Sequence, residues 1–407
     1  MRIVEINSVN KGSTGNIMLG VASVARAQGH DVLMCYPKCR DNMARYIEGD
    51  YLIGNRYSRN IGRFLSQHFK AEHCIHIYST FALIARLKKY RPDVIHMHNI
   101  HDSFLNIPLF FHYVKRAGIP VVWTLHDCWL YTGHCPHYVD TGCNCNKWQC
   151  ECKGCKYFNQ YPRSSYDDSA YKFNLKKHIL LGLGDLLTLA PVSSWLAGEV
   201  AKSFLKNVHS CVVPNGVDMG VFKPTFDVGI REKYGIPNGR IILSAATEWS
   251  DRKGLSDYFK LAGKLAVGEC IVLVGVNDGI IDRLPKGIVG IKRTDSKEDM
   301  AKLYSVADVV LSLSYAETFG LTIVEANACG TPVVVYDNTA QPELVHSGNG
   351  KVVKTGDVEA VHEAIGCVIS KGTEFWKNQC REMVVNKYSE DVSYRGYIDL
   401  FKQIRLL

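Results

Sequence analysis

Short apolar runs of four to eight residues recur along the chain, separated by longer amphipathic stretches. The runs are rich in Val and Ile, and such runs with helices between them are typical of parallel sheets covered on both faces. Five lie in the first half, at 2–9, 31–37, 93–99, 121–127 and 186–193, and six in the second, at 240–247, 270–276, 287–292, 308–314, 331–337 and 351–354. The pattern therefore predicts an α/β protein with two doubly wound domains.

The junction between the domains is expected at residues 212–224, where two prolines and two glycines interrupt the apolar pattern. We place an N-terminal, acceptor-side domain at 1–218, with a cysteine-rich insert at 128–162, and a C-terminal, nucleotide-sugar-binding domain at 219–387. A final helix at 388–407 is expected to pack back toward the N-terminal domain. Ligands of doubly wound sheets lie beyond the carboxyl ends of the strands, so we expect functional residues in the strand-to-helix loops.

The composition is that of a globular protein with a sizeable core, 46% apolar and 22% charged. No apolar run is long enough to span a bilayer, and Glu5 falls where a signal peptide would need apolar residues, so we expect a cytoplasmic protein. Residues 1–218 carry 25 basic and 16 acidic side chains, a net charge of +9, and the rest of the chain brings the formal total to +8. A basic half of this kind suits a membrane surface or an acidic substrate.

A strand-to-helix loop in the second half has the features of a phosphate site. The apolar run 308–314 precedes the loop YAET, and a helix is expected to begin at Phe319-Gly320 and to end before Gly330. The free backbone N–H groups of Phe319, Gly320 and Leu321 would lie at the positive end of the helix dipole, where phosphate binds. Glycine at this place lets a phosphate approach the backbone closely.

Two carboxylates accompany this phosphate site, Glu317 in the loop and Glu325 about a turn and a half into the helix. A carboxylate at the position of Glu325 can accept hydrogen bonds from both hydroxyls of a ribose. Glu317 can reach whatever is attached to the phosphate. The ligand that this arrangement predicts is a nucleotide-sugar; the simpler alternative makes both glutamates surface charges.

The full string, S-x-x-E-x-F-G-x4-E-A-x-A-x-G-x-P-V-V at 314–334, resembles the signature of the retaining family-4 glycosyltransferases. The resemblance covers nearly the whole chain, including VPNGVD at 213–218 and a glycine-containing loop after the first strand with Gly12, Ser13, Thr14 and Gly15. It implies the GT-B fold, two doubly wound Rossmann-like domains facing a cleft. It also implies transfer of a hexosyl unit from a nucleoside-diphosphate sugar without a catalytic metal. We expect UDP as the nucleotide because UDP-sugars are the more frequent donors.

The resemblance also assigns roles to three side chains. His126 in TLHD matches a histidine that contacts the donor sugar, and Lys253 matches a lysine on the diphosphate, where negative charge builds as the glycosidic bond breaks. Most relatives carry an arginine in G-R-L shortly before that lysine, whereas this chain has ATEW at 246–249. Arg252 is the candidate substitute. A second departure is TAQPELV at 339–345, where relatives often have two glycines before the PE.

Seven of the 15 cysteines crowd into residues 128–155. Cys152-Lys-Gly-Cys155 has the spacing of a structural zinc site, and Cys135 and Cys143 are the natural second pair. Zinc would replace a hydrophobic core in this insert, which reads as loop-like and poor in aromatic residues. A subset of the family has a similar insert after HDCW. Rival ligands are Cys145, Cys150, His134 and His137, and free thiols or artefactual disulfides remain the alternative.

Two further segments allow two interpretations each. HMHNIHD at 96–102 places His96 and His98 on one strand face, as in a metal site. We favour the alternative, a strand end where His98 or Asn99 borders the acceptor pocket.

The segment 56–70 reads as a basic amphipathic helix. It could press on a membrane that carries a lipid-linked acceptor, or it could pack on its own domain with solvated arginines.

These observations together predict a retaining glycosyltransferase that extends a bacterial surface polysaccharide, capsule or O-antigen, on an undecaprenyl-linked acceptor. No nucleic-acid partner is expected. Two rival functions share the architecture. A nucleotide-sugar 2-epimerase would lack the Glu317 to Glu325 string and rely on acid–base residues, whereas a non-catalytic nucleotide-sugar binder is favoured if the missing arginine has no substitute.

Overall fold

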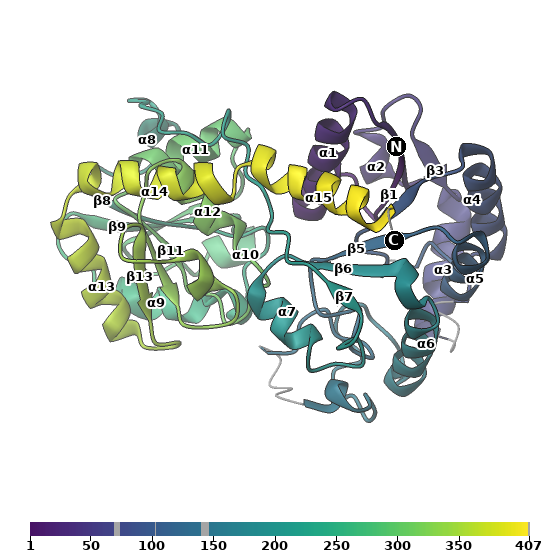
Figure 1. Cartoon of the computed structure of the whole chain (residues 1–407). Helices are drawn as coiled ribbons and strands as arrows, with labels where there is room; N and C mark the ends of the chain where they lie inside the picture. The colour runs from purple at the N-terminus through teal and green to yellow at the C-terminus, as the bar shows by residue number, and fades with distance from the viewer. Residues whose placement is uncertain (69–73, 102, 140–145, 406–407) are drawn as a thin grey trace. The chain divides into compact units, whose positions relative to one another are not determined.

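The computed structural model describes residues 1–68, 74–101, 103–139 and 146–405. It contains two parallel sheets, with strand orders β3-β2-β1-β4-β5-β6-β7 and β10-β9-β8-β11-β12-β13 (Figure 1). Helices connect successive strands and pack on both faces of each sheet. The predicted fold class, α/β with two doubly wound domains, is confirmed.

The chain divides into two compact units, which we describe separately. Unit 1 comprises residues 1–214 and 394–407, and unit 2 comprises residues 215–393. The sequence had suggested boundaries at 218 and 387, inside the linker and the last helices.

The strands of unit 1 are β1 (Arg2–Ile6), β2 (Asp31–Pro37), β3 (Tyr51–Ile53), β4 (Val94–Met97), β5 (Val121–Leu125), β6 (Leu187–Pro191) and β7 (His209–Ser210). Its helices are α1 (Gly12–Ala27), α2 (Arg40–Met43), α3 (Arg56–His68), α4 (Ile77–Tyr90), α5 (Ile107–Ala117), α6 (Ser169–Leu181) and α7 (Ser194–Val200), with 3-10 turns η1 (Asn146–Gln149) and η2 (Gly184–Leu186). The chain runs from β1 outward to β3 and then returns to β4 on the other side of β1. The connections therefore diverge between β1 and β4, which is where doubly wound sheets bind ligands.

The strands of unit 2 are β8 (Arg240–Ala245), β9 (Glu269–Val274), β10 (Ile288–Ile291), β11 (Val309–Ser312), β12 (Val333–Tyr336) and β13 (Gly350–Val353). Its helices are α8 (Ile230–Lys233), α9 (Leu255–Ala262), α10 (Asp278–Ile281), α11 (Lys297–Val306), α12 (Leu321–Ala328), α13 (Val358–Ser370) and α14 (Thr373–Lys387), with 3-10 turns η3 (Asp251–Lys253) and η4 (Gln341–Leu344). Here the connections diverge between β8 and β11. The loops that follow these two strands hold Lys253 and Glu317.

The last helix, α15 (Glu390–Arg405), contributes residues from Tyr394 onward to the core of unit 1. Tyr397 and Phe401 are fully buried in a cluster with Ile3 and Met18. Gly20 on α1 makes this packing possible, because a Cβ there would lie 2.1 Å from the ring of Tyr394. A larger residue at this position would require the Tyr394 ring to move.

Candidate active site

In unit 2 the loops after β8 and β11 are bound to each other through their backbones. Gly254, with φ of 74°, ends η3 so close to β11 that a Cβ would lie 2.2 Å from the carbonyl oxygen of Leu313. The N–H of Tyr315 donates to the carbonyl of Arg252 over 2.8 Å. This close approach places the side chains of η3 against the loop that carries Glu317.

Lys253 and Glu317 form an ion pair between these two loops. Their side chains are 20% and 18% exposed. Arg252 Nη1 donates to the carbonyl oxygen of Ala316 over 3.3 Å, so both cations reach the same loop although they are neighbours in sequence. Burial would raise the pKa of Glu317, but the charges of Lys253 and Arg252 hold it below its usual value. Glu317 is therefore ionised at neutral pH.

The residues just before α12 include a glycine with a left-handed backbone. Gly320, the residue before the helix, has φ of 112°, and a Cβ there would lie 2.9 Å from the Ile323 side chain. Within the described ranges the N–H groups of Phe319 and Gly320 donate to no protein oxygen. The Phe319 ring is buried against Tyr388, with centroids 5.8 Å apart, so it anchors the loop while its backbone stays available. Leu321 begins the helix, two residues later than expected.

Glu325 lies on the next turns of α12 and is partly buried. Its Oε2 accepts a hydrogen bond of 3.1 Å from the hydroxyl of Tyr304 on α11. Burial raises the pKa of Glu325 to about 7, and the Tyr304 bond and the charge of Lys297 only partly oppose this rise. A carboxylate that is poorly solvated and has one protein donor is suited to accept further hydrogen bonds from a ligand.

A third loop, between β12 and η4, supports the Glu317 loop. Thr339 has φ of 52°, a left-handed conformation that costs a β-branched residue energy, and its Oγ1 accepts the N–H of Glu317 over 2.8 Å. Gln341 Nε2 donates to the carbonyl oxygen of Ser314 over 2.8 Å. The sequence indicated this loop only through its departure from the glycines of relatives; the role of Thr339 was missed.

In unit 1 the glycine-containing loop follows β1, beside the point where the connections diverge. Gly12 begins α1 with φ of 69°, and Gly15 packs so tightly that a Cβ would lie 2.5 Å from the backbone of Asn10. Thr14 Oγ1 accepts from the side chain of Asn7 over 3.4 Å. Ser13 is exposed at the start of the helix.

His126 belongs to a buried polar cluster that the sequence did not predict. Its Nε2 lies 2.9 Å from Nδ1 of His98, and Nε2 of His98 lies 2.9 Å from Oε2 of Glu5. Nδ1 of His96 lies 2.9 Å from the same Glu5 oxygen, and Nε2 of His96 lies 2.7 Å from Oγ1 of Thr124. The parallel register of β1 and β4 produces the cluster, because it pairs Glu5 with His96.

Burial lowers the pKa of each of the three histidines to about 3, so all are neutral at pH 7. Burial also raises the pKa of Glu5, and the hydrogen bond from His98 opposes the rise. Glu5, His96 and His98 form the one group among the described residues with ligand atoms close enough for a metal ion. Each of their ring nitrogens already faces a hydrogen-bond partner, which explains the cluster without a metal. Of the two residues expected at the acceptor pocket, His98 is fully buried and Asn99 is partly exposed.

In the cysteine-rich insert, the structure describes Cys135, Cys152 and Cys155, whereas Cys143 and the rival ligand Cys145 lie outside the described residues. A hydrogen bond from Cys135 lowers the pKa of Cys155 to about 7, against the opposing effect of burial. The Cys155 N–H donates to Asp167 over 2.9 Å.

The insert is not poor in aromatic packing. The ring of Trp148 is 2% exposed and lies 5.1 Å from that of Tyr131 and 5.2 Å from that of Tyr138. The expectation of a segment without its own core was therefore wrong.

Comparison with known proteins identifies the family. Residues 15–221 match the family model "Glycosyltransferase Family 4", and residues 230–389 match "Glycosyl transferases group 1". The chain is 26% identical over 279 residues to the putative colanic acid biosynthesis glycosyl transferase WcaC of Escherichia coli K12, covering 66% of this chain and 65% of WcaC. It is 33% identical over 167 residues to a D-inositol 3-phosphate glycosyltransferase of Mycobacterium tuberculosis, covering 38% of this chain and 35% of that protein. These matches thus span less than two thirds of each curated relative.

Among solved structures, Anabaena HepE in complex with UDP-glucose has a TM-score of 0.69 at 16% identity, covering 99% of this chain and all of HepE. A glycosyltransferase from Rickettsia africae has a TM-score of 0.68 at 18% identity, covering 99% of this chain and 98% of that one. At these identities the likeness shows the GT-B fold. Because the Family 4 model covers half of the chain and the group 1 model covers most of the rest, this protein belongs to the family-4, group 1 glycosyltransferases.

Proposed function

We propose that this enzyme transfers a hexosyl unit from a UDP-sugar to a growing surface glycan, with retention of anomeric configuration. The observation that carries the proposal is the convergence, after β8 and β11, of Lys253, Arg252 and Glu317 beside the first turn of α12. Two cations and two free N–H groups at the start of a helix suit a diphosphate. Binding of UDP-glucose by HepE, which shares the fold, supports the choice of donor.

In the proposed reaction Lys253, Arg252 and the first turn of α12 stabilise the charge that grows on the leaving diphosphate. Glu325 accepts hydrogen bonds from the ribose hydroxyls and so positions the nucleoside. Glu317 holds Lys253 in place and remains ionised; a carboxylate paired with a lysine is a poor nucleophile. The acceptor hydroxyl then loses its proton to the leaving phosphate, and no protein carboxylate forms a glycosyl intermediate, unlike in retaining glycosidases.

Nucleotide binding is the first test of this proposal. UDP should raise the melting temperature of the wild type more than GDP, ADP, dTDP or CMP does, since a ligand that binds only the folded state stabilises it by RT ln(1 + [L]/Kd). The Glu325→Ala variant should bind UDP more weakly by about 1–3 kcal/mol, because the ribose loses a buried acceptor. The exposed Glu359 provides the matched control, Glu359→Ala, which should respond like the wild type.

The products formed from a UDP-sugar then distinguish the proposed transfer from its two rivals. If UDP is released only when an acceptor is present, the enzyme is a transferase. Conversion of the free UDP-sugar to an epimer would support the isomerase, and binding without turnover would support a non-catalytic role. If no nucleotide stabilises the wild type, the proposal fails.

We further propose that unit 1 docks on an anionic membrane that presents an undecaprenyl-linked acceptor. On α3 and α4 six large apolar side chains are 49–91% exposed: Tyr57, Ile61, Phe64, Ile77, Tyr78 and Phe81. The apolar side of α3 thus faces outward, which favours the membrane interpretation over packing on its own domain. No helix of the described residues is long and apolar enough to cross a bilayer.

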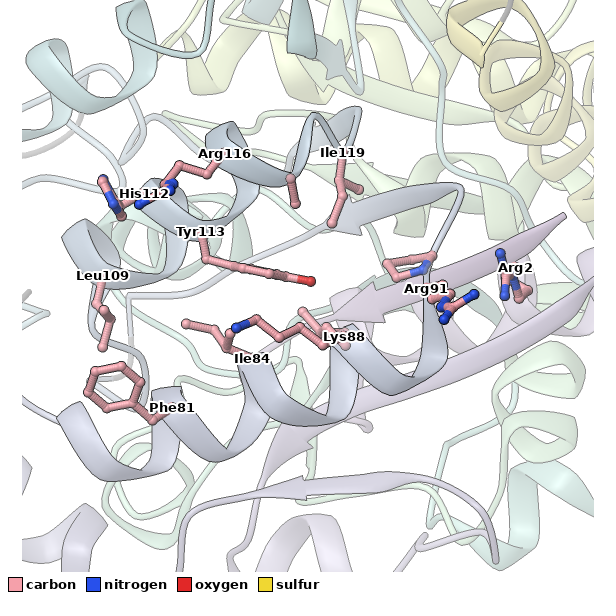
Figure 2. A pocket seen from close by; sticks show the side chains of 13 residues that line it. Arg2, Phe81, Ile84, Lys88, Arg91, Leu109, His112, Tyr113, Arg116 and Ile119 are labelled. Atoms are coloured by element: carbon pink, nitrogen blue, oxygen red, sulfur yellow. The ribbon is translucent and has the colours of Figure 1, made fainter.

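A basic hollow of about 770 Å³ between α4 and α5 adjoins this surface (Figure 2). Phe81, Ile84 and Tyr113 line its interior, and four cations surround it: Arg2, Lys88, Arg91 and Arg116. None of the four forms an ion pair with a described carboxylate. Unpaired cations around apolar side chains suit anionic lipid headgroups and their first methylenes.

Vesicle binding tests the docking surface. The wild type should co-sediment with vesicles that contain phosphatidylglycerol, and less so as salt rises. The double variant Arg91→Gln/Arg116→Gln should lower the partition coefficient by about 30-fold, since each basic residue near the surface contributes about 1 kcal/mol. Lys286→Gln/Lys351→Gln, which removes the same charge from exposed positions of unit 2, should bind normally. Equal binding of both double variants would overturn the assignment.

We also propose that Cys135, Cys143, Cys152 and Cys155 hold a structural zinc ion. The contact between Cys135 and Cys155 and the lowered pKa of the Cys155 thiol support thiolate ligands. The sulfur atoms of the three described cysteines do not all lie within the spacing of a metal site, so Cys152 would have to move toward the other two when zinc binds. Four cysteines would close the site to water and exclude a catalytic role. The insert also contains the aromatic cluster of Trp148, Tyr131 and Tyr138. Zinc would therefore add to this core rather than replace it.

Metal analysis of purified protein should therefore find about one zinc per chain, as expected for one closed site. Cys152→Ser should lose zinc and lower the melting temperature, because binding free energy of a structural zinc contributes to folding. Cys367→Ser, at an exposed cysteine of α13, should change neither. Fully folded wild-type protein without metal would remove this proposal.

A further inference from the structure

The loops that follow β4 and β5 in unit 1 are joined by a partly buried carboxylate, Asp127. Its Oδ2 lies 3.0 Å from Nε2 of His101 and accepts a hydrogen bond of 3.2 Å from Nδ2 of Asn99. Its Oδ1 accepts the N–H of Trp129 over 2.9 Å. Because β4 and β5 are adjacent parallel strands, this group lies beyond their carboxyl ends, where doubly wound sheets bind ligands.

Asp127 is ionised at neutral pH. Burial would raise its pKa, but the charge and the hydrogen bond of His101 hold the pKa below its usual value. An ionised carboxylate only accepts hydrogen bonds, so Asn99 turns its amide nitrogen toward Asp127 and its Oδ1 away. Among the described residues no donor meets this oxygen, and Asn99 is partly exposed. Oδ1 of Asn99 is therefore available to the hydroxyl of a ligand.

The end of the cysteine-rich insert reaches the same pair through Tyr161. The hydroxyl oxygen of Tyr161 lies 3.0 Å from Nδ1 of His101, whose other ring nitrogen faces Asp127. The two rings meet edge to face with centroids 5.5 Å apart, and the buried ring of Trp129 lies 5.5 Å from His101. Tyr161 is nevertheless 60% exposed. The insert thus presents to solvent an aromatic ring that is held at its hydroxyl.

A link between the insert and the loop after β4 would explain the hydrogen bond of Tyr161 but not the charge beneath it. The side chains of His101 and Asp127 are only 7% and 12% exposed. Removing a carboxylate from water costs free energy, and apolar side chains often hold a structure at lower cost. Charged groups that are kept at such a cost beyond the ends of strands are typical of functional sites.

We propose that Asn99 and Tyr161 form a subsite for a sugar of the acceptor glycan. Oδ1 of Asn99 accepts a hydrogen bond from a sugar hydroxyl, and the Tyr161 ring packs on C–H groups of the sugar. His101 and Asp127 are positioning residues that hold these two side chains in place. Two hydrogen bonds and one imidazole ring separate Asn99 from Tyr161, a span comparable with one or two sugar rings. The subsite rests on the function proposed above and gives the insert a part in selecting the acceptor.

Saturation-transfer NMR of the full chain with the methyl glycosides of glucose, galactose, mannose and fucose tests the subsite without any donor. At least one glycoside should bind the wild type. Tyr161→Ala should weaken that binding by about 10- to 100-fold, since the ring supplies most of the apolar contact. Asn99→Ala should weaken it by about 10-fold, as expected for a lost hydrogen-bond acceptor. Tyr171→Ala, which removes a 41% exposed ring from α6, should bind like the wild type.

The positioning role is tested by a double-mutant cycle. Tyr161→Phe keeps the ring but removes the hydroxyl that meets His101, and it should weaken glycoside binding by about threefold. His101→Leu should have a similar effect, and the double variant should be no weaker than the weaker single variant, because both changes remove one contact. Additive effects would exclude His101 from this role. If His101→Leu does not fold, the two variants of the exposed Tyr161 still decide whether its ring binds sugar.

Wild-type protein that binds none of the four glycosides, or a Tyr161→Ala variant that binds them with wild-type affinity, would overturn the proposal. A purely structural link would lower the melting temperature of Tyr161→Ala and leave glycoside binding unchanged. In transfer assays with UDP-glucose and the bound glycoside, Tyr161→Ala should raise the KM for the glycoside and leave the Kd for UDP unchanged. If UDP does not bind the wild type, the proposed function fails, whereas glycoside binding still decides whether the subsite exists.

Discussion

Lys253→Ala is expected to lower kcat for glycosyl transfer by about 100- to 1,000-fold, the usual cost of losing one preorganised group that stabilises transition-state charge. Lys253 is the cation whose ammonium reaches the Glu317 loop, and both partners of the pair are about four-fifths buried. A charge in such a place is worth more than one in water. Initial rates of UDP release at saturating donor and acceptor measure the effect.

Lys264→Ala provides the control, because this lysine also pairs with a glutamate but lies at the surface of the same unit. Its kcat should remain within about twofold of the wild-type value, as expected for a surface ion pair. A Lys253→Ala enzyme that turns over at the wild-type rate would exclude Lys253 from stabilising the diphosphate. Arg252→Ala belongs in the same series: a loss of 10-fold or more would identify Arg252 as the second cation in place of the arginine of relatives.

Glu325→Gln is expected to stabilise the folded protein at pH 8 by up to about 3 kcal/mol. Burial raises the pKa of Glu325 to about 7, above the value near 4.5 of the unfolded chain. The folded state therefore binds the proton more tightly, and this contribution to stability is complete below about pH 4.5 and is lost as the pH rises to about 7. A difference of roughly 2.5 pKa units corresponds to about 3 kcal/mol, and the amide avoids the loss because it carries no charge.

The same carboxyl group should make donor binding depend on pH. Only the ionised form accepts hydrogen bonds from both ribose hydroxyls, so the wild type should bind UDP-glucose more tightly at pH 8 than at pH 6, whereas Glu325→Gln should bind weakly at both. Denaturant unfolding and calorimetric titration at the two pH values measure the two effects. Glu359→Gln, at an exposed glutamate, should leave both unchanged; equal pH dependence in Glu325→Gln and wild type would exclude Glu325 as the source.

Most of the sheet could be predicted from the sequence because buried parallel strands are recognisable as continuous apolar runs. Eleven runs correspond to strands, and only β3 and β7 were missed. These two contain three and two residues and lie at the edges of the sheet, where pairing to a neighbouring strand rather than apolar content decides that a strand forms. The helix of the signature was also predicted, with its start displaced from Phe319 to Leu321.

Some features of the candidate site could be predicted from the local sequence, and others depend on contacts between distant segments. Glycines, the helix start and the two glutamates of the signature are local features, so Gly320, Glu317 and Glu325 could be named from the string alone. The orientation of Arg252 could not be, because it depends on the approach of η3 to the carbonyl oxygen of Ala316, 64 residues away. The left-handed backbone of Thr339, which accepts a hydrogen bond from the Glu317 loop, could likewise not be predicted from its local sequence.

By itself the sequence determined most of the strands, the fold class and the signature helix with its two carboxylates, because these depend on the spacing of apolar residues and on the chemistry of a single loop. Only the tertiary structure decided which charged groups meet. Glu5 and His96 are 91 residues apart and become partners through the register of β1 and β4, and Lys253 meets Glu317 because β8 and β11 are adjacent in the sheet. Side-chain partners of this kind follow from how strands are ordered and aligned, which the local pattern of residues does not encode.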